Sequence, residues 1–195
     1  MLVYSVTAVL GYLIGSFPTG VFITRRKYGI DVREMGSGNI GATNVTRVFG
    51  WYAGLLVFLI DFLKGWGPLY LYWRFIEKDM YGLAILSAAL VLGHCFSLYL
   101  KLNGGKGVAT SFGCLTFVAP WCALFSGLVY VALLMTTKIS AIGSLGGLLS
   151  AILYLVVVQP PWPVSILVIG ISVVVSARHR DNIKRLIQSY QQRKK

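Results

Sequence analysis

Long apolar runs constrain this chain more than any other feature of its sequence. A helix needs roughly 20 predominantly apolar residues to cross a lipid bilayer. Runs near that length cover Leu2–Ile23, Trp51–Trp73, Met80–Leu100 and Ile139–Val158, and a shorter run covers Pro163–Ala177. One further run, Val108–Met135, is longer than a single span needs and contains Pro120. The sequence therefore predicts an all-α integral membrane protein built as a helical bundle.

The composition excludes the usual soluble classes of protein. Hydrophobic residues make up 56% of the chain and charged residues only 12%, whereas soluble domains carry about 25% charged residues. So few charges cannot cover a surface that faces water, which argues against a soluble enzyme, a disordered tail and a coiled coil. At this length we expect one domain, residues 1–195.

The distribution of basic residues indicates how the chain is oriented. The net charge is +12, from 18 Lys and Arg against 6 Asp and Glu. If Pro120 divides the long run into two short spans, the total is seven, and every basic residue outside the spans except Arg74 and Lys78 falls on one side. The positive-inside rule makes that side cytoplasmic, which places the N-terminus outside and the C-terminus inside. Six spans stay an alternative because kinked spans tolerate proline, but they would put the basic tail on the opposite side.

The first of three unusual polar segments on the predicted cytoplasmic side is Gly36–Arg47. Glycines let backbone N–H groups approach a ligand, hydroxyls and amides add donors, and a guanidinium offers a fork for an anion. The candidate ligand-binding residues here are Ser37, Gly38, Asn39, Gly41, Thr43, Asn44 and Arg47. The simpler alternative is a flexible turn that precedes the second span.

The second segment, Asn103–Thr110, leads directly into the predicted fourth span. Free N–H groups and the helix dipole make such a position receptive to phosphate. It is not a Walker A loop, because Leu100 stands where that loop needs glycine and Gly107 where it needs serine or threonine. A tight turn with a snorkelling lysine is the simpler alternative. The candidates are Gly104, Gly105, Lys106, Gly107 and Thr110, with His94 of the third span as support.

The third segment, Arg178–Leu186, follows the last span. His179 can serve as an acid or a base near neutral pH, and a helix would place His179 and Asn182 on one face. Arg178 and Arg185 are further candidates for substrate contacts. The alternative is a basic tail that rests on anionic lipid headgroups. Because the topology puts all three segments on one side of the membrane, they predict a phosphate-handling site beside apolar walls that suit an acyl chain.

Two charged residues lie inside a predicted span. Asp61 and Lys64 are three residues apart on one helical face, so they can pair with each other, either as a structural pair or as a coupling pair for transport. With two histidines and few carboxylates, the chain offers no credible metal site, and we expect no cofactor. The basic residues lie in short loops beside spans, so we expect no nucleic-acid partner.

The three segments closely resemble the cytoplasmic motifs of the bacterial acyl-phosphate:glycerol-3-phosphate acyltransferases, the PlsY family. The matching stretches are Ser37–Arg47, Gly104–Thr110 with Gly93-His94 upstream, and His179–Leu186. The resemblance covers nearly the whole chain. Relatives often carry proline where Ser97 stands, and Ser189-Tyr190-Gln191 replaces a Gly-x-Glu of the family.

The resemblance implies a reaction at the cytoplasmic face of the bacterial inner membrane. A fatty acyl group passes from acyl-phosphate to the 1-hydroxyl of glycerol 3-phosphate, giving lysophosphatidic acid and phosphate, in the first committed step of phospholipid synthesis. A soluble enzyme that produces acyl-phosphate is an expected partner, beside the membrane lipids. The sequence does not determine the preferred acyl length or the oligomeric state.

The residues suggest how this transfer would proceed. No Ser-His-Asp or Cys-His arrangement is legible, so we expect direct attack by the hydroxyl without a covalent acyl-enzyme. Lys106 and its glycines would hold the glycerol 3-phosphate, and His179 with Asn182 would orient the hydroxyl. The acyl-phosphate would bind Ser37, Asn39 and Arg47. The reverse assignment of the two phosphates fits equally well, and the proton could pass to His179 or to a substrate phosphate.

A transporter or channel for an organic phosphate is the competing hypothesis. It would use the same basic segments, with Asp61 and Lys64 as the coupling pair. Transporters commonly place their sites near the bilayer midplane and show internal repeats. We see no repeat, and the polar segments lie in loops on one side, which favours an enzyme.

Overall fold

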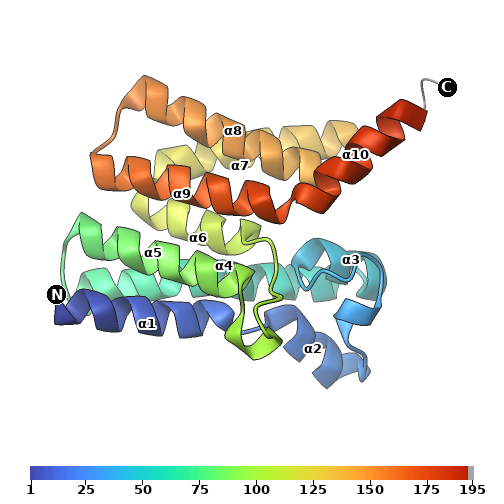
Figure 1. Ribbon diagram of the computed structural model, residues 1–195, viewed down its shortest axis with the longest axis horizontal. Helices are drawn as coiled ribbons and strands as arrows, with labels where there is room; N and C mark the ends of the chain where they lie inside the picture. Colours follow the sequence, from blue (N-terminus) through green and yellow to red (C-terminus); the bar gives the residue numbers. More distant parts are fainter. Residues whose placement is uncertain (193–195) are drawn as a thin grey trace.

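The computed structural model describes residues 1–192, and all regular elements among them are helices (Figure 1). Apolar helices run along the length of the bundle: α1 (Leu2–Ser16), α4 (Trp51–Phe75), α5 (Met80–Cys95), α6 (Val108–Val118), α7 (Pro120–Thr137), α8 (Ser140–Val158) and α9 (Trp162–Arg178). Five helical stretches are long and apolar enough to cross a membrane, and α9 joined to α10 (Arg180–Gln192) would be a sixth, bent by 57°. This all-helical, multi-pass architecture agrees with the prediction.

The long apolar run divides where the sequence predicted. Helix α6 ends at Val118 and α7 begins at Pro120, the first helical position, where the missing N–H of proline leaves no bond unmade. The 11 residues of α6 extend only about 16 Å, roughly half the thickness of the hydrocarbon core. It is therefore too short to cross a membrane by itself, and other helices surround it.

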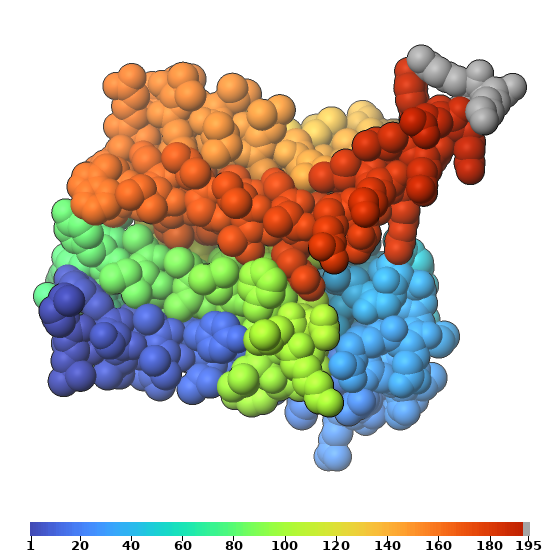
Figure 2. All heavy atoms as spheres, in the orientation of Figure 1, coloured from blue at the N-terminus to red at the C-terminus, as the bar shows by residue number. Residues whose placement is uncertain are grey.

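The shorter elements gather at one end of the bundle. Figure 1 shows α2 (Thr19–Tyr28), α3 (Ala42–Phe49) and α10 at that end, with the loop after α5 beside them, whereas Met1 lies at the other end. Two 3-10 turns, η1 (Val32–Glu34) and η2 (Leu98–Leu100), belong to the same connections. Helix α10 extends beyond the body of the molecule (Figure 2). The predicted tail bases Arg193, Lys194 and Lys195 lie outside the described residues.

Glycines let the central helices approach each other backbone to backbone. A Cβ atom on Gly15 of α1 would lie 2.1 Å from the carbonyl oxygen of Leu90 in α5. A Cβ atom on Gly65 of α4 would lie 2.2 Å from the carbonyl oxygen of Thr110 in α6. Helices in lipid gain little from the hydrophobic effect, so such close packing of small residues holds them together.

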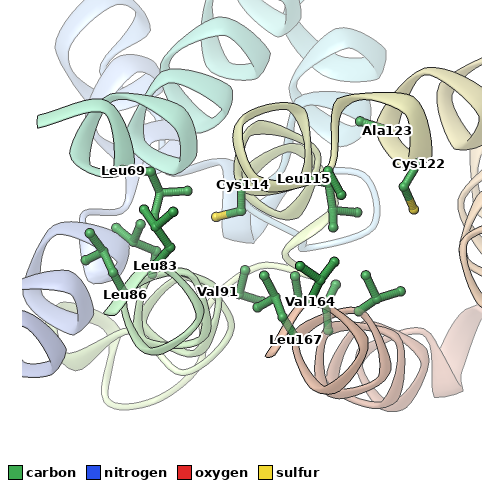
Figure 3. Close-up of a cluster of buried hydrophobic side chains, with 14 of the residues drawn as sticks. Leu69, Leu83, Leu86, Val91, Cys114, Leu115, Cys122, Ala123, Val164 and Leu167 are labelled. Atoms are coloured by element: carbon green, nitrogen blue, oxygen red, sulfur yellow. The ribbon is translucent and has the colours of Figure 1, made fainter. Parts of the chain in front are cut away.

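The buried core surrounds α6. Figure 3 shows Cys114 and Leu115 of α6 among Leu69 of α4, Leu83 of α5 and Leu167 of α9. These side chains are at most 5% exposed, so α6 is fixed on several sides. The position of α6 matters because the second polar segment leads into its first turn. The core therefore fixes the position of the glycine-rich segment Asn103–Thr110.

Candidate functional site

A cavity of about 570 Å³ opens at the end of the bundle where the three polar segments meet. Its polar lining includes Ser37, Asn39, Thr43, Asn44, Arg47, Lys106, Lys138, Ser140, His179, Asn182 and Arg185. Its apolar lining comes from α4, α6, α7 and α8, through Phe58, Phe112, Leu115, Val131, Leu134, Leu148 and Ala151. The same cavity therefore has charged groups that suit a phosphate and an apolar wall that suits a hydrocarbon chain.

Asn44 organises the first segment. This side chain is buried, and its Nδ2 donates to the carbonyl oxygens of Met35 and Asn39, both at 3.0 Å. Its Oδ1 accepts from the backbone N–H of Ser37 at 2.8 Å. Because these bonds occupy the amide, Asn44 folds the loop rather than offering a free donor. The bonds fix the segment so that Ser37 and the guanidinium of Arg47 line the cavity.

The glycine-rich loop before α6 is held from two sides. The N–H of Gly105 donates to the carbonyl oxygen of His94 at 2.9 Å. Arg178 donates from Nε to the carbonyl oxygen of Gly105 at 3.0 Å and from its terminal nitrogen to that of Gly104 at 2.8 Å. These contacts occupy the carbonyl groups of Gly104 and Gly105. Gly107, the N-cap of α6, adopts a φ of +83°, which favours glycine.

The first turn of α6 lies at the cavity and has backbone N–H groups without an acceptor. Within residues 1–192, no hydrogen-bond acceptor meets the backbone N–H groups of Gly107, Val108 or Ala109, and all three residues line the cavity. Free N–H groups at a helix N-terminus, together with the helix dipole, form a site for an anion. The structure thus places the predicted anion nest beside the other charged groups.

Lys106 connects the second segment to the third. Its Nζ donates to Oδ1 of Asn182 at 2.5 Å, which ties the loop to α10. Burial, and after it the nearby guanidinium groups of Arg185 and Arg47, lower the pKa of Lys106 from 10.5 to about 8. Asp181 is the one opposing charge among these causes, and its side chain is exposed. The excess of cations around Lys106 favours the binding of a negatively charged ligand.

His179 lies at the bend between α9 and α10 and is 2% exposed. Its Nδ1 is 2.8 Å from the carbonyl oxygen of Val175, and because a carbonyl oxygen only accepts, Nδ1 carries the hydrogen. Burial lowers the pKa of His179 and the positive charge of Lys106 acts in the same direction, so the ring is neutral near pH 7. Its Nε2 is therefore available to accept a proton.

The family model described as glycerol-3-phosphate acyltransferase matches residues 5–189. This chain belongs to the glycerol-3-phosphate acyltransferase family. A family member from Aquifex aeolicus (strain VF5) is 40% identical over 185 residues, which cover 95% of this chain and 96% of the relative. A member from Myxococcus xanthus (strain DK1622) is 48% identical over 141 residues, covering 72% and 73% of the two chains.

Two solved structures of a family member share this fold. The glycerol 3-phosphate form of PlsY (YgiH), an integral membrane glycerol 3-phosphate acyltransferase, has a TM-score of 0.89 and 39% identity. Its lysophosphatidic acid form has a TM-score of 0.87 and 38% identity, and both matches cover 95% of this chain and 92% of the other. The resemblance carried by the three motifs is thus confirmed, and the chain is a multi-pass bacterial membrane protein.

The acyltransferase family motifs divide into residues that line the cavity and residues that support it. Among the predicted site residues, the cavity is lined by Ser37, Asn39, Gly41, Thr43, Asn44, Arg47, His94, Lys106, Gly107, His179, Asn182 and Arg185. Gly38, Gly104, Gly105, Thr110 and Arg178 do not line it. Sequence reasoning missed several other lining residues, among them Asp61, Ser111, Tyr130, Lys138, Ser140 and Ser144. Among residues 1–192, no group of His, Cys, Asp or Glu could hold a metal ion.

The predicted intramembrane pair is present in this family member and is fully engaged. Lys64 Nζ lies 2.9 Å from Asp61 Oδ1 and also donates to the carbonyl oxygen of Phe17 at 2.9 Å. The same Asp61 oxygen accepts from the hydroxyl of Thr19 at 2.7 Å. These bonds join α2 to α4, so the pair holds these two helices together at the cavity wall, which Asp61 lines. The ring of His94, hydrogen-bonded to Thr110 at 3.2 Å, lies nearby, with Nδ1 3.8 Å from Asp61.

Proposed function

We propose that this protein is an acyl-phosphate:glycerol-3-phosphate acyltransferase of the bacterial inner membrane. It transfers a fatty acyl group to the 1-hydroxyl of glycerol 3-phosphate and releases lysophosphatidic acid and phosphate. The cavity carries this proposal, because its charged end suits two phosphate-bearing substrates and its apolar end suits an acyl chain. Membership of the family supports glycerol 3-phosphate as the acceptor.

The charges at the cavity match the two substrates. Each phosphate group carries about −1.5 to −2 charges at neutral pH. Arg47, Lys106 and Arg185 contribute cations, and the N-terminus of α6 adds backbone donors. In our assignment Lys106 with the first turn of α6 holds glycerol 3-phosphate, while Ser37, Asn39 and Arg47 hold the leaving phosphate of the donor.

The transfer is a direct displacement in this proposal. The glycerol oxygen forms a bond to the acyl carbonyl carbon, the carbon–oxygen bond to phosphate breaks, and phosphate leaves with the bonding electrons. His179 and Asn182 orient the hydroxyl, and its proton passes to Nε2 of neutral His179 or to a phosphate oxygen of the donor. The reaction needs no cofactor and no covalent acyl-enzyme.

The orientation in the membrane follows from the same charges. We propose one domain with seven spans, α6 being a partial one, an N-terminus outside the cell and the cavity at the cytoplasmic face. The basic residues of α2 and α10 support this orientation, because they lie at the cavity end of the bundle (Figure 1). A soluble enzyme that makes acyl-phosphate could then deliver the donor from the cytoplasm.

The proposal is tested by a comparison of acyl donors. The protein purified in detergent or lipid is given glycerol 3-phosphate with palmitoyl-phosphate, palmitoyl-CoA or palmitoyl-acyl-carrier protein. We expect phosphate release and lysophosphatidic acid with palmitoyl-phosphate alone. Product formation from the thioesters, with none from palmitoyl-phosphate, would overturn the choice of donor. Uptake of glycerol 3-phosphate into vesicles without any product would favour the transporter instead.

The pKa of Lys106 predicts an alkaline limit to activity. The active form carries the ammonium, and because the pKa is lowered to about 8, this form is lost as the pH rises through that value. We expect kcat/KM, which reports the free enzyme, to fall above about pH 8. In Lys106→Arg, whose guanidinium does not titrate in this range, any remaining activity should not show that decline. An identical decline in both proteins would assign it to another group.

Gly105→Ala tests the support of the glycine-rich loop. A Cβ atom on Gly105 would lie 2.2 Å from Nε2 of the buried His94 ring, so the loop must move. We expect kcat/KM to fall at least about tenfold, because misplaced donors stabilise the reacting charge less well. Gly67→Ala in α4 is the matched control, since no atom lies within 4 Å of its added Cβ. Equal activity of the two folded variants would contradict the supporting role.

A further inference from the structure

Lys138 is a cation of the cavity that none of the three motifs contains. It is the C-cap of α7 and begins the turn into α8, with a φ of 58°. It lines the cavity, and within residues 1–192 its ammonium has neither a carboxylate nor a hydrogen-bond partner. In the sequence it is only one more positive charge beside a predicted span. Its position raises the question of which anion it meets.

The turn that carries Lys138 is tied to the first motif. The hydroxyl of Ser140 lies 3.1 Å from that of Thr43 in α3 and 3.1 Å from that of Tyr130 in α7. All three residues line the cavity. Thr43 is one helical turn from Arg47, so these hydrogen bonds hold the turn against the helix that presents Arg47. Lys138 and Arg47 therefore belong to one connected wall.

The cavity wall changes from apolar to charged where α7 ends. Val131 and Leu134 line the cavity from one side of α7, and Lys138, the first residue of the turn after the helix, lines the same cavity. A ligand that lies along this face has its hydrocarbon against Val131 and Leu134 and its charged group at Lys138. Glycerol 3-phosphate has no hydrocarbon chain and cannot use this face, whereas an acyl-phosphate can.

We propose that Lys138 binds the phosphate of the acyl-phosphate donor. This inference rests on the proposed function and adds to it a residue that selects the donor. Together with Arg47 it surrounds the leaving phosphate, while Lys106 and the first turn of α6 serve glycerol 3-phosphate. It also resolves the choice between the two phosphate assignments, because the α7 face gives the donor a direction in the cavity.

The test compares the KM values of the two substrates in Lys138→Gln. We expect the KM for palmitoyl-phosphate to rise about tenfold, as for the loss of one charge-assisted hydrogen bond, with the KM for glycerol 3-phosphate unchanged. Lys138→Arg should keep a nearly normal KM for the donor. The matched control is Lys101→Gln, because Lys101 is also an exposed lysine with positive φ (51°), but it does not line the cavity.

Three outcomes would overturn the inference: an unchanged KM for palmitoyl-phosphate in Lys138→Gln, an equal rise in Lys101→Gln, or a rise confined to glycerol 3-phosphate. The wild-type protein decides the underlying function separately. If it uses palmitoyl-CoA and not palmitoyl-phosphate, the proposed donor is wrong before Lys138 is tested. If it uses palmitoyl-phosphate and the variants are indistinguishable, only the role of Lys138 fails.

Discussion

Replacement of Lys106 by alanine is expected to lower kcat by about 10² to 10³ while the protein stays folded. The ammonium contacts Asn182 at 2.5 Å and lies between the glycine-rich loop and α10. Its loss removes a charge from the place where both substrates bring negative charge, and it releases Asn182 from the loop. Phosphate release from palmitoyl-phosphate in the presence of glycerol 3-phosphate measures the effect.

The stability of the Lys106→Ala variant separates chemistry from folding. Lys106 is partly buried among like charges, so its removal does not cost a favourable ion pair. We expect the thermal unfolding midpoint in detergent to stay close to that of the wild type. Lys101→Ala, an exposed change outside the cavity, should leave both rate and midpoint unaltered. A Lys106→Ala rate within a factor of about three of the wild type would remove the second segment from the site.

Asp61→Ala is expected to cost about 3–5 kcal/mol of unfolding free energy, which is typical when one partner of a buried ion pair is removed. Asp61 is 2% exposed and Lys64 is 9% exposed, so the variant leaves a lysine inside the bundle without its counter-charge. It also removes the acceptor of the Thr19 hydroxyl. The loss should appear as a large fall in the thermal unfolding midpoint.

The double variant Asp61→Ala, Lys64→Met is the control for this cost. It removes both charges and restores an apolar side chain of similar length, so we expect it to recover most of the lost stability. If the single variant unfolds like the wild type, the pair does not stabilise the frame. If the double variant is no better than the single one, the cost comes from the Thr19 hydrogen bond rather than from the unpaired Lys64.

The membrane architecture could be predicted because the bilayer sets a simple rule for sequence. Apolar length identified the helices, and Pro120 marked the break between α6 and α7 because proline suits the first position of a helix. The distribution of basic residues predicted that the three motifs lie on one side of the membrane, and the structure has them at one end of the bundle. The Asp61–Lys64 pair followed from a spacing of three residues on a helix. Each of these signals is local in the chain.

The parts of the site that sequence did not reveal depend on contacts between distant segments. Arg178 looks like a substrate ligand beside His179, but it donates to carbonyl oxygens of the loop 73 and 74 residues earlier. Asn44 looks like a donor for substrate, but its amide is consumed by the backbone of its own loop. Lys138 served in the sequence only as a positive charge that indicates orientation in the membrane. The direction of a side chain in a turn depends on the fold, so residue spacing alone cannot predict it.

The backbone-to-backbone helix contacts have a consequence for engineering a different chain-length preference. At Gly15 and Gly65 the neighbour is a carbonyl oxygen, which cannot change rotamer to make room, so those helix pairs tolerate almost no repacking. Between α7 and α8 the limits are looser: an added Cβ on Gly146 would meet the side chain of Leu133, which can adjust, and the carbonyl oxygens nearest to Gly143 and Gly147 would lie at 2.8 and 3.0 Å. Selection for longer or shorter acyl products should therefore find its permissive substitutions around Gly146 and Leu133, while the helix pairs at Gly15 and Gly65 stay fixed.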